Sequence, residues 1–326
     1  MNSLYPLKFK PIFKDKVWGG QKIKTVLKQD FGDLPNCGEA WVLSGVENEQ
    51  SIVANGFLAG NELNELVEVY MGDLIGEKNF ERFGNQFPIL VKILDTNDWL
   101  SVQVHPDDEL AKKRNLGNGK NEMWYIMDAE KDAELICGFK KEMNKNEYLH
   151  YFENGKLKSI LNYEKVEKGN VLFMPAGRVH TLGPGLMLAE IQQSSDTTYR
   201  IYDWDRIDSE GKGRDLHTEE ALDAIDFRVE KKYKTAYRDI KNETSSIVKT
   251  PYFVINLMDL DKGLLKDYVS LDSFVIHLCV EGEYVLKYAS GFEQVKAGEV
   301  VLIPALLNEI EIQPMKTAKV LEIYIS

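Results

Sequence analysis

Short apolar runs bounded by polar and turn-forming residues recur along the chain. Three clear examples span residues 88–94, 134–139 and 171–175, and Gly, Asp, Asn or Lys lies at their ends. Runs of this kind are typical of β-strands. They alternate with turn-rich stretches, which favours antiparallel sheets arranged as a sandwich or a barrel. The pattern therefore predicts a mainly β fold.

Helical spacing of apolar residues is confined to a few segments. It occurs over residues 63–70, 107–114 and parts of 140–161, where apolar positions return every three or four residues. All three segments lie in the first half of the chain. We therefore expect helical insertions in the N-terminal part of a β protein.

One stretch of the chain occurs twice in similar form. Residues 166–175 and 295–304 each contain Gly, then Val two positions later, then Pro six positions after the Gly. Two copies of one β unit would explain this spacing, although two similar turns could also arise independently. The polar stretch 229–246 is the expected boundary, which gives a catalytic domain over 1–235 and a second, degenerate domain over 236–326.

The two copies differ in the residues that could carry chemistry. Five residues after the proline, the first copy has His180 and the second has Glu309. We therefore expect the first copy to hold the active site and the second to serve in packing. The other histidines, His150, His217 and His277, are expected to be ordinary hydrogen-bonded residues.

Residues 100–106 place Ser101, Gln103 and His105 on one face of a strand. Polar side chains inside a sheet are costly unless they find a partner, and a divalent ion satisfies several at once. With Glu122 and His180, they give two imidazoles and one carboxylate. This set suits zinc with an open coordination position, and Gln103 could complete the shell; iron, manganese or cobalt fit nearly as well.

Glu190 and Arg200 lie in a second polar cluster downstream of His180. Glu190 follows an apolar run, so a strand could carry it beside the metal, where desolvation would raise its pKa toward that of a general base. Arg200 could stabilise an enediolate or grip a phosphate. An ordinary ion pair between these two residues is an equally good interpretation.

Composition narrows the function further. The formal charge is -12 and the sequence pI is about 5.1, which argues against a nucleic-acid surface. No apolar stretch approaches the roughly 20 residues of a membrane span, and the start of the chain has no secretory pattern. The three cysteines form no CxxC pair. We expect a cytoplasmic protein that binds neither nucleic acid nor membrane.

Taken together, the spaced motifs resemble the type I mannose-6-phosphate isomerase family over most of the chain. The matching segments are residues 18–20, 38–41, 103–106, 120–122, 175–180 and 190–200, with Lys92 on the strand before Gln103. The chain resembles the short bacterial form of the family, because it is too short for an extra helical domain. It also has Asn121 where many members have Pro.

This resemblance implies two cupin (jelly-roll) β-barrels and interconversion of mannose 6-phosphate and fructose 6-phosphate through a cis-enediol. It implies one zinc ion per chain, bound by Gln103, His105, Glu122 and His180. Catalytic roles are expected for Arg200, Glu190 and Lys120, and substrate-binding roles for Ser101 and Lys92. The expected partner is a sugar phosphate, and the chain is expected to be a monomer or a homodimer.

Two other classes remain open at this stage. Cupin sites with two histidines and one carboxylate also hold iron in oxygenases, although such an enzyme has no evident need for Lys92, Lys120 and Arg200. A non-catalytic sugar-phosphate-binding cupin would use Glu190 and Arg200 only to orient its ligand.

Overall fold

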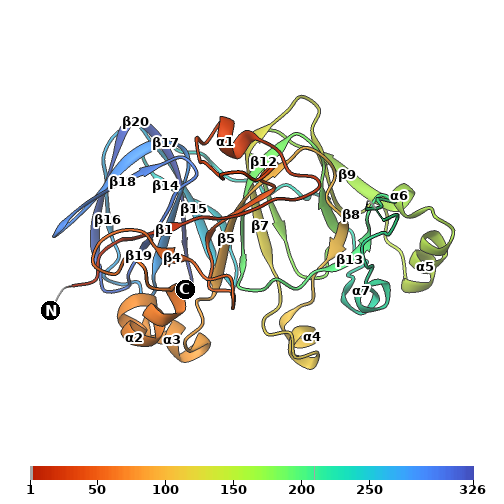
Figure 1. Cartoon of the computed structure of the whole chain (residues 1–326), viewed down its shortest axis with the longest axis horizontal. Helices are drawn as coiled ribbons and strands as arrows, with labels where there is room; N and C mark the ends of the chain where they lie inside the picture. The colour runs from red at the N-terminus through yellow and green to blue at the C-terminus, as the bar shows by residue number, and fades with distance from the viewer. Residues whose placement is uncertain (1–2, 209) are drawn as a thin grey trace.

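The fold is mainly β, as predicted, and almost all its strand pairs are antiparallel. The computed structural model describes residues 3–208 and 210–326. Its strands form sheets of nine, six and five strands (Figure 1). The six-stranded sheet has the order β10-β7-β12-β5-β3-β2 and the five-stranded sheet the order β13-β6-β11-β8-β9. Within the described residues neither of these two sheets closes into a barrel, because each ends in unpaired edge strands.

The two sheets of the N-terminal half are built from strands spread between residues 12 and 202. The six-stranded sheet contains β2 (Ile12–Lys14), β3 (Glu39–Leu43), β5 (Ile89–Thr96), β7 (Glu122–Ala129), β10 (Val171–Met174) and β12 (Leu186–Gln193). The five-stranded sheet contains β6 (Val102–Val104), β8 (Glu134–Phe139), β9 (Leu161–Lys165), β11 (His180–Leu182) and β13 (Tyr199–Tyr202). Strands β5 and β12 are buried along their whole length.

The nine-stranded sheet belongs mostly to the C-terminal half, which lies at the left of Figure 1. Its main path is β14-β15-β20-β17-β19-β1-β4, and β16 and β18 pair with β20 and β17. The strands are β1 (Leu7–Lys10), β4 (Ile52–Val53), β14 (Thr244–Lys249), β15 (Val254–Leu260), β16 (Leu264–Asp267), β17 (Val275–Tyr288), β18 (Gly291–Lys296), β19 (Val300–Ile303) and β20 (Glu309–Tyr324).

Seven helices within the described residues connect or flank these sheets. They are α1 (Lys22–Thr25), α2 (Leu63–Ile75), α3 (Glu77–Phe83), α4 (Asp108–Lys113), α5 (Lys145–Glu153), α6 (Leu157–Ile160) and α7 (Thr218–Ala224). All three segments with helical spacing are helical in the structure. Helix α4 begins where the Asp107 carboxylate accepts a hydrogen bond from the backbone N–H of Leu110 at 2.8 Å. In the part of the chain that the structure describes, no helix is long and apolar enough to cross a membrane.

The predicted repeat is visible in the strand order. The first copy runs β10-β7-β12-β5-β3 and the second runs β19-β17-β20-β15-β14, with the corresponding strands at corresponding places. The glycines of the repeated motif, Gly169 and Gly298, both have a φ of +86°. Few residues other than glycine adopt this left-handed conformation, so the same turn geometry explains why both copies have Gly there.

The register shows which residues correspond. Glu190 of β12 lies opposite Trp124 and Lys92 in the first copy. Glu322 of β20 lies opposite His277 and Asn256 in the second copy. Both glutamates are therefore central in their sheets and buried, and only their neighbours differ.

Glu322 is the centre of a buried polar cluster in the C-terminal copy. Its carboxylate accepts hydrogen bonds from Asn256 at 2.8 Å and from the Tyr268 hydroxyl at 2.7 Å, and the Lys266 ammonium lies 2.8 Å away. The Tyr268 hydroxyl is also 3.1 Å from Nε2 of His277. Such a network leaves several buried groups unpaired if its shared acceptor is removed.

Glu322→Ala is therefore expected to lower the free energy of unfolding by about 3 kcal/mol, the scale for breaking a buried ion pair. We expect the metal content of the protein to stay unchanged, because this cluster lies in the copy without a predicted metal site. Urea unfolding and elemental analysis measure the two quantities, with Glu309→Ala as the control because Glu309 is exposed. A variant of normal stability, or one that loses metal, would contradict this assignment.

One hydrophobic cluster contains residues of both halves, whereas three others each lie within one half. Strand β1, near the start of the chain, pairs with β19 of the C-terminal half and with β4. The rings of Phe87 and Phe274 lie 4.7 Å apart between their centroids. The boundary at residues 235 and 236 stays a prediction, and β1 and β4 lie in the sheet of the C-terminal copy.

Candidate active site

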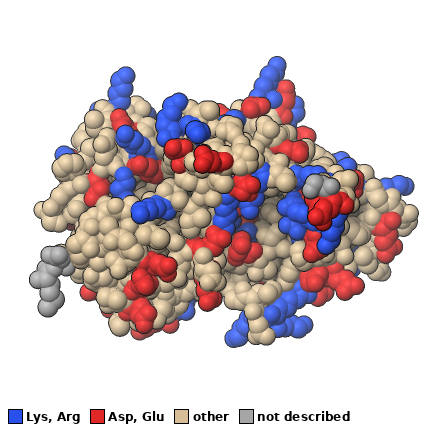
Figure 2. All heavy atoms as spheres, in the orientation of Figure 1, with Lys and Arg blue, Asp and Glu red and all other residues tan. Residues whose placement is uncertain are grey.

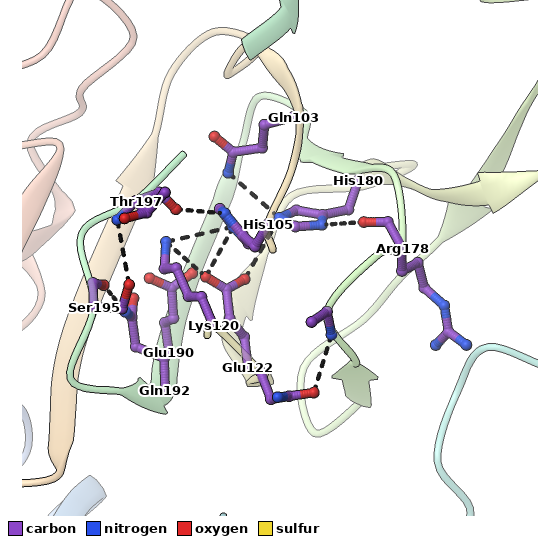
Figure 3. Close-up of polar contacts among 12 residues, drawn as sticks. Gln103, His105, Lys120, Glu122, Arg178, His180, Glu190, Gln192, Ser195 and Thr197 are labelled. Atoms are coloured by element: carbon purple, nitrogen blue, oxygen red, sulfur yellow. Dashed lines mark hydrogen bonds and ion pairs between the residues drawn. The ribbon is translucent and has the colours of Figure 1, made fainter. Parts of the chain in front are cut away.

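The candidate site lies between the six-stranded and five-stranded sheets. Glu122 is the first residue of β7, His180 is the first residue of β11, and His105 directly follows β6. One ligand atom from each of the three side chains lies within 4.8 Å of the others. The three residues are at most 1% exposed. Their side chains point toward one another in Figure 3. The predicted triad is thus assembled from both sheets.

Backbone carbonyls orient both imidazoles. Nδ1 of His105 lies 2.9 Å from the carbonyl oxygen of Thr197, and Nδ1 of His180 lies 2.8 Å from that of Arg178. A carbonyl oxygen can only accept, so each Nδ1 carries the proton and donates. Each Nε2 then has its lone pair free, and these atoms lie 3.2 and 3.5 Å from the Glu122 carboxylate.

The protonation states of the triad suit a divalent cation. Burial, followed by the charge of Lys120, lowers the pKa of His105 to about 3. Burial also lowers the pKa of His180. Burial by itself would raise the pKa of Glu122, but the charge of Lys120 and the nearby imidazoles hold it well below its usual value. At neutral pH the site therefore presents two neutral imidazoles and one carboxylate.

The donor set fits a metal ion. Both carboxylate oxygens of Glu122 are buried and, among the described residues, receive no hydrogen bond of good geometry. The Lys120 ammonium, 2.9 Å from Oε1, offsets part of the cost of burying this carboxylate, and a bound cation would satisfy the remaining lone pairs. Gln103 is the fourth candidate ligand, and its side-chain amide lies 3.4 Å from Nε2 of His180. Two imidazoles, one carboxylate and an amide oxygen match zinc sites with an open position.

Glu190 is buried beside the triad on β12. Its carboxylate lies 3.2 Å from the Lys92 ammonium and accepts a hydrogen bond from the Trp124 indole N–H at 2.8 Å. Burial, followed by the charge of Glu122, raises the pKa of Glu190. An elevated pKa makes a carboxylate a better proton acceptor, which is what a general base requires.

Lys120 is the cation nearest to the triad in Figure 3. Its ammonium lies 2.9 Å from Glu122 and 3.4 Å from Nε2 of His105. Lys120 is only 4% exposed. It therefore places a fixed positive charge at the centre of the site.

A cavity of about 310 Å³ opens onto these residues. Six of the predicted site residues line it, namely Lys92, Ser101, Gln103, Lys120, Glu190 and Arg200. The three remaining predicted residues, His105, Glu122 and His180, are the buried triad. All nine predicted site residues are therefore brought together by the fold.

Sequence reasoning missed other residues of this cavity. Lys16, Trp18 and Glu39 lie in its wall, and Arg214 lies there from the segment between β13 and α7. Trp18 and Glu39 belong to segments 18–20 and 38–41, which carried a family signal without a role, and Lys16 lies two residues before the first of these segments. Nothing in the polar, unpatterned segment around Arg214 marked it as a site residue.

Arg200 is tied to the segment just before α7. Its backbone N–H donates to Nδ1 of His217 at 3.2 Å, and its carbonyl oxygen accepts from the His217 backbone N–H at 2.7 Å. The Arg200 guanidinium donates to the carbonyl oxygen of Asp215 at 2.9 Å. Arg200 also lies opposite Gln103 in the pairing of β13 with β6. His217 is thus a hydrogen-bonded residue, as predicted, and its partners are the backbone groups of Arg200.

Comparisons with known proteins agree with this geometry. Residues 6–143 match the family model described as the catalytic domain of type I phosphomannose isomerase. The chain is 36% identical over 315 residues to the mannose-6-phosphate isomerase ManA of Bacillus subtilis (strain 168), covering 94% of this chain and 96% of that protein. It is 37% identical over 258 residues to a mannose-6-phosphate isomerase of Streptococcus mutans, covering 77% of each chain.

Solved structures show the same fold. The crystal structure of the mannose 6-phosphate isomerase from Bacillus subtilis superposes with a TM-score of 0.87 at 31% identity, covering 98% of this chain and 99% of that chain. A putative mannosephosphate isomerase from Archaeoglobus fulgidus superposes with a TM-score of 0.78 at 20% identity, covering 98% of this chain and 97% of that chain. At that lower identity the likeness concerns the fold alone.

Proposed function

Because the chain belongs to the type I phosphomannose isomerase family, we propose that it interconverts mannose 6-phosphate and fructose 6-phosphate at a single zinc site. The observation that carries the proposal is the buried triad of His105, Glu122 and His180 beside the buried Glu190. We further propose Gln103 as the fourth metal ligand. The three cysteines are all free and buried, which supports the predicted reducing, cytoplasmic setting.

The reaction moves a proton between neighbouring carbons. Glu190 removes the proton from the carbon beside the carbonyl of mannose 6-phosphate, and the electron pair forms the carbon–carbon double bond while the carbonyl oxygen takes the negative charge. The proton of the neighbouring hydroxyl passes to this oxygen through the cis-enediol stage. Glu190 then delivers its proton to the former carbonyl carbon, and the oxygen that gave up its hydroxyl proton becomes the ketone oxygen of fructose 6-phosphate. The Trp124 N–H and Lys92 hold the Glu190 carboxylate in place during both transfers.

Negative charge develops on the substrate oxygens during this transfer. When bound, zinc supplies a Lewis acid that polarises these oxygens without any redox change. Lys120 and Arg200 add fixed positive charge in the same cavity. Ser101 and Lys92 line its wall and are proposed to contact substrate hydroxyls.

Arg200→Lys is expected to lower kcat by about a hundredfold or more, the scale for one preorganised oxyanion donor, with a smaller change in KM. Lysine keeps the charge but loses the planar fork that can serve two oxygens. Steady-state kinetics decides the role. An enzyme with unchanged kcat and a raised KM would make Arg200 a binding residue only.

The function itself is tested by a coupled assay of the purified protein with mannose 6-phosphate. We expect activity that disappears on chelation and returns with zinc, together with solvent proton exchange at the substrate. Iron in the purified protein with oxygen consumption would indicate an oxygenase instead. Binding of the sugar phosphate with no proton exchange would indicate a non-catalytic cupin.

A further inference from the structure

A second cavity adjoins the first. It has a volume of about 570 Å³ and is lined largely by the segment that joins β13 to α7, where basic and acidic side chains gather in Figure 2. Arg200 and Arg214 line both cavities. These two arginines therefore mark the junction between the catalytic cavity and the second cavity.

The cations of the catalytic cavity differ in how they are neutralised. Each of its lysines has its own carboxylate: Lys16 lies 3.3 Å from Glu39, Lys92 lies 3.2 Å from Glu190, and Lys120 lies 2.9 Å from Glu122. Arg200 has no carboxylate within 4.0 Å among the described residues. The cation of this cavity that has no carboxylate of its own therefore lies at the junction of the two cavities.

Arg200, Arg206 and Arg214 have a single buried carboxylate among them at the junction. Asp203 accepts hydrogen bonds from Arg214 at 2.6 and 2.7 Å and from Arg206 at 2.8 Å. Asp203 is 5% exposed, whereas the other aspartates of this wall, Asp208 and Asp215, are exposed and screened by water. Burial and the charge of Arg214 lower the pKa of Arg200, as expected where positive charge is not balanced.

Several guanidinium N–H groups at the junction have no hydrogen-bond acceptor among the described residues, so an anion could bind there. Nε of Arg200 and Nη1 of Arg206 are buried and, among the described residues, donate no hydrogen bond. The Asp98 carboxylate lies 3.6 Å from Nη1 of Arg206, which is too far for a hydrogen bond. Arg214 uses Nε and Nη2 for Asp203, which leaves the edge with Nη1 free.

A phosphate monoester fits these features. It carries between one and two negative charges near neutral pH and offers three acceptor oxygens, and arginine binds it through paired donors. A hexose 6-phosphate has this group at the end of the molecule remote from the carbons that react. With the reacting carbons at the metal, the phosphate extends away from them, and the junction lined by Arg200 and Arg214 offers it positive charge.

We propose that Arg214, oriented by Asp203, binds the phosphate of the substrate and so determines specificity for phosphorylated sugars. This inference rests on the proposed function for the identity of the substrate. Arg206 shares the Asp203 carboxylate and extends the same subsite. Asp203 is a positioning residue, because it holds Arg206 and Arg214 without facing the substrate itself.

Arg214→Gln is the test. We expect KM for mannose 6-phosphate to rise about tenfold to a hundredfold, the range for losing one hydrogen bond to a charged group, with kcat changed less than threefold. Arg214→Lys should lie between this variant and the wild type, because it keeps the charge. The dissociation constant for inorganic phosphate, measured by calorimetry, should rise by the same factor as KM.

Arg228→Gln is the matched control. Arg228 also pairs with an aspartate, Asp226, at 2.6 Å, but its side chain is 87% exposed and it lines neither cavity. Unchanged KM and unchanged phosphate binding in a folded Arg214→Gln variant would overturn the proposal. A different outcome separates the two proposals. If the wild type bound phosphate but did not isomerise the sugar, and the Arg214→Gln variant did not bind phosphate, the phosphate subsite would stand and the proposed function would fall.

Discussion

Replacement of either His105 or His180 by alanine is expected to release the metal and abolish isomerase activity. Each imidazole is buried, and its donating Nδ1 is fixed by a backbone carbonyl, so no other side chain can take its place. Loss of a Lewis acid removes several kcal/mol of transition-state stabilisation. We therefore expect kcat/KM to fall by about three orders of magnitude or more.

Elemental analysis and the coupled assay measure the two effects together. His150→Ala is the matched control, because His150 is an exposed histidine on α5, away from the site. It should retain metal and activity. Full zinc occupancy in both His105→Ala and His180→Ala would refute the assignment of the metal centre.

Glu190→Gln is expected to lower kcat by a factor of about 10² to 10⁴, the usual contribution of a general base. Glutamine has nearly the same shape and can still accept from the Trp124 N–H, so the structure should change little. The amide cannot take up the proton from the substrate carbon. Metal content should stay unchanged, because Glu190 is not one of the proposed ligands.

Solvent proton exchange gives a second readout of this variant. If Glu190 is the base, incorporation of deuterium from the solvent into the substrate should fall in parallel with kcat. Glu39→Gln is the control. It removes one carboxylate charge from the same cavity, where Glu39 lies beside Lys16 and Trp41, but it leaves the proposed base in place. A Glu190→Gln enzyme that still exchanges the proton at the normal rate would show that another group is the base.

The buried triad could be predicted because its signals are local. The alternation of Ser101, Gln103 and His105 indicates one strand face, and Glu122 and His180 are the further donors expected downstream of it. Strand β8 runs from Glu134 to Phe139, the same residues as the predicted apolar run. Apolar periodicity and turn chemistry suffice for elements of this kind.

Other parts of the site leave no such trace in the sequence. The carbonyl groups of Thr197 and Arg178 belong to the backbone, so any residue there could supply them. The place of Arg214 depends on an irregular segment that follows no period, and its partner Asp203 is eleven residues away. The sheets do not close into barrels because their edge strands are unpaired. The identity of the edge strands depends on how the strands pair in three dimensions, which the sequence pattern does not indicate.

The pairing of β1 with β19 has a consequence for how the protein is made. Strand β1 pairs with β4 close by in sequence, but its other partner, β19, is made only about 300 residues later, since Leu7 lies opposite Leu302. Contacts this distant in sequence slow folding, because the chain loses conformational entropy on closing a long loop before the contact can stabilise the fold. During synthesis on the ribosome, the edge of β1 that pairs with β19 in the folded protein would therefore stay unpaired, and unpaired strand edges promote aggregation. Chaperone dependence of expression should therefore fall if a circular permutation places β1 directly after the C-terminal strand.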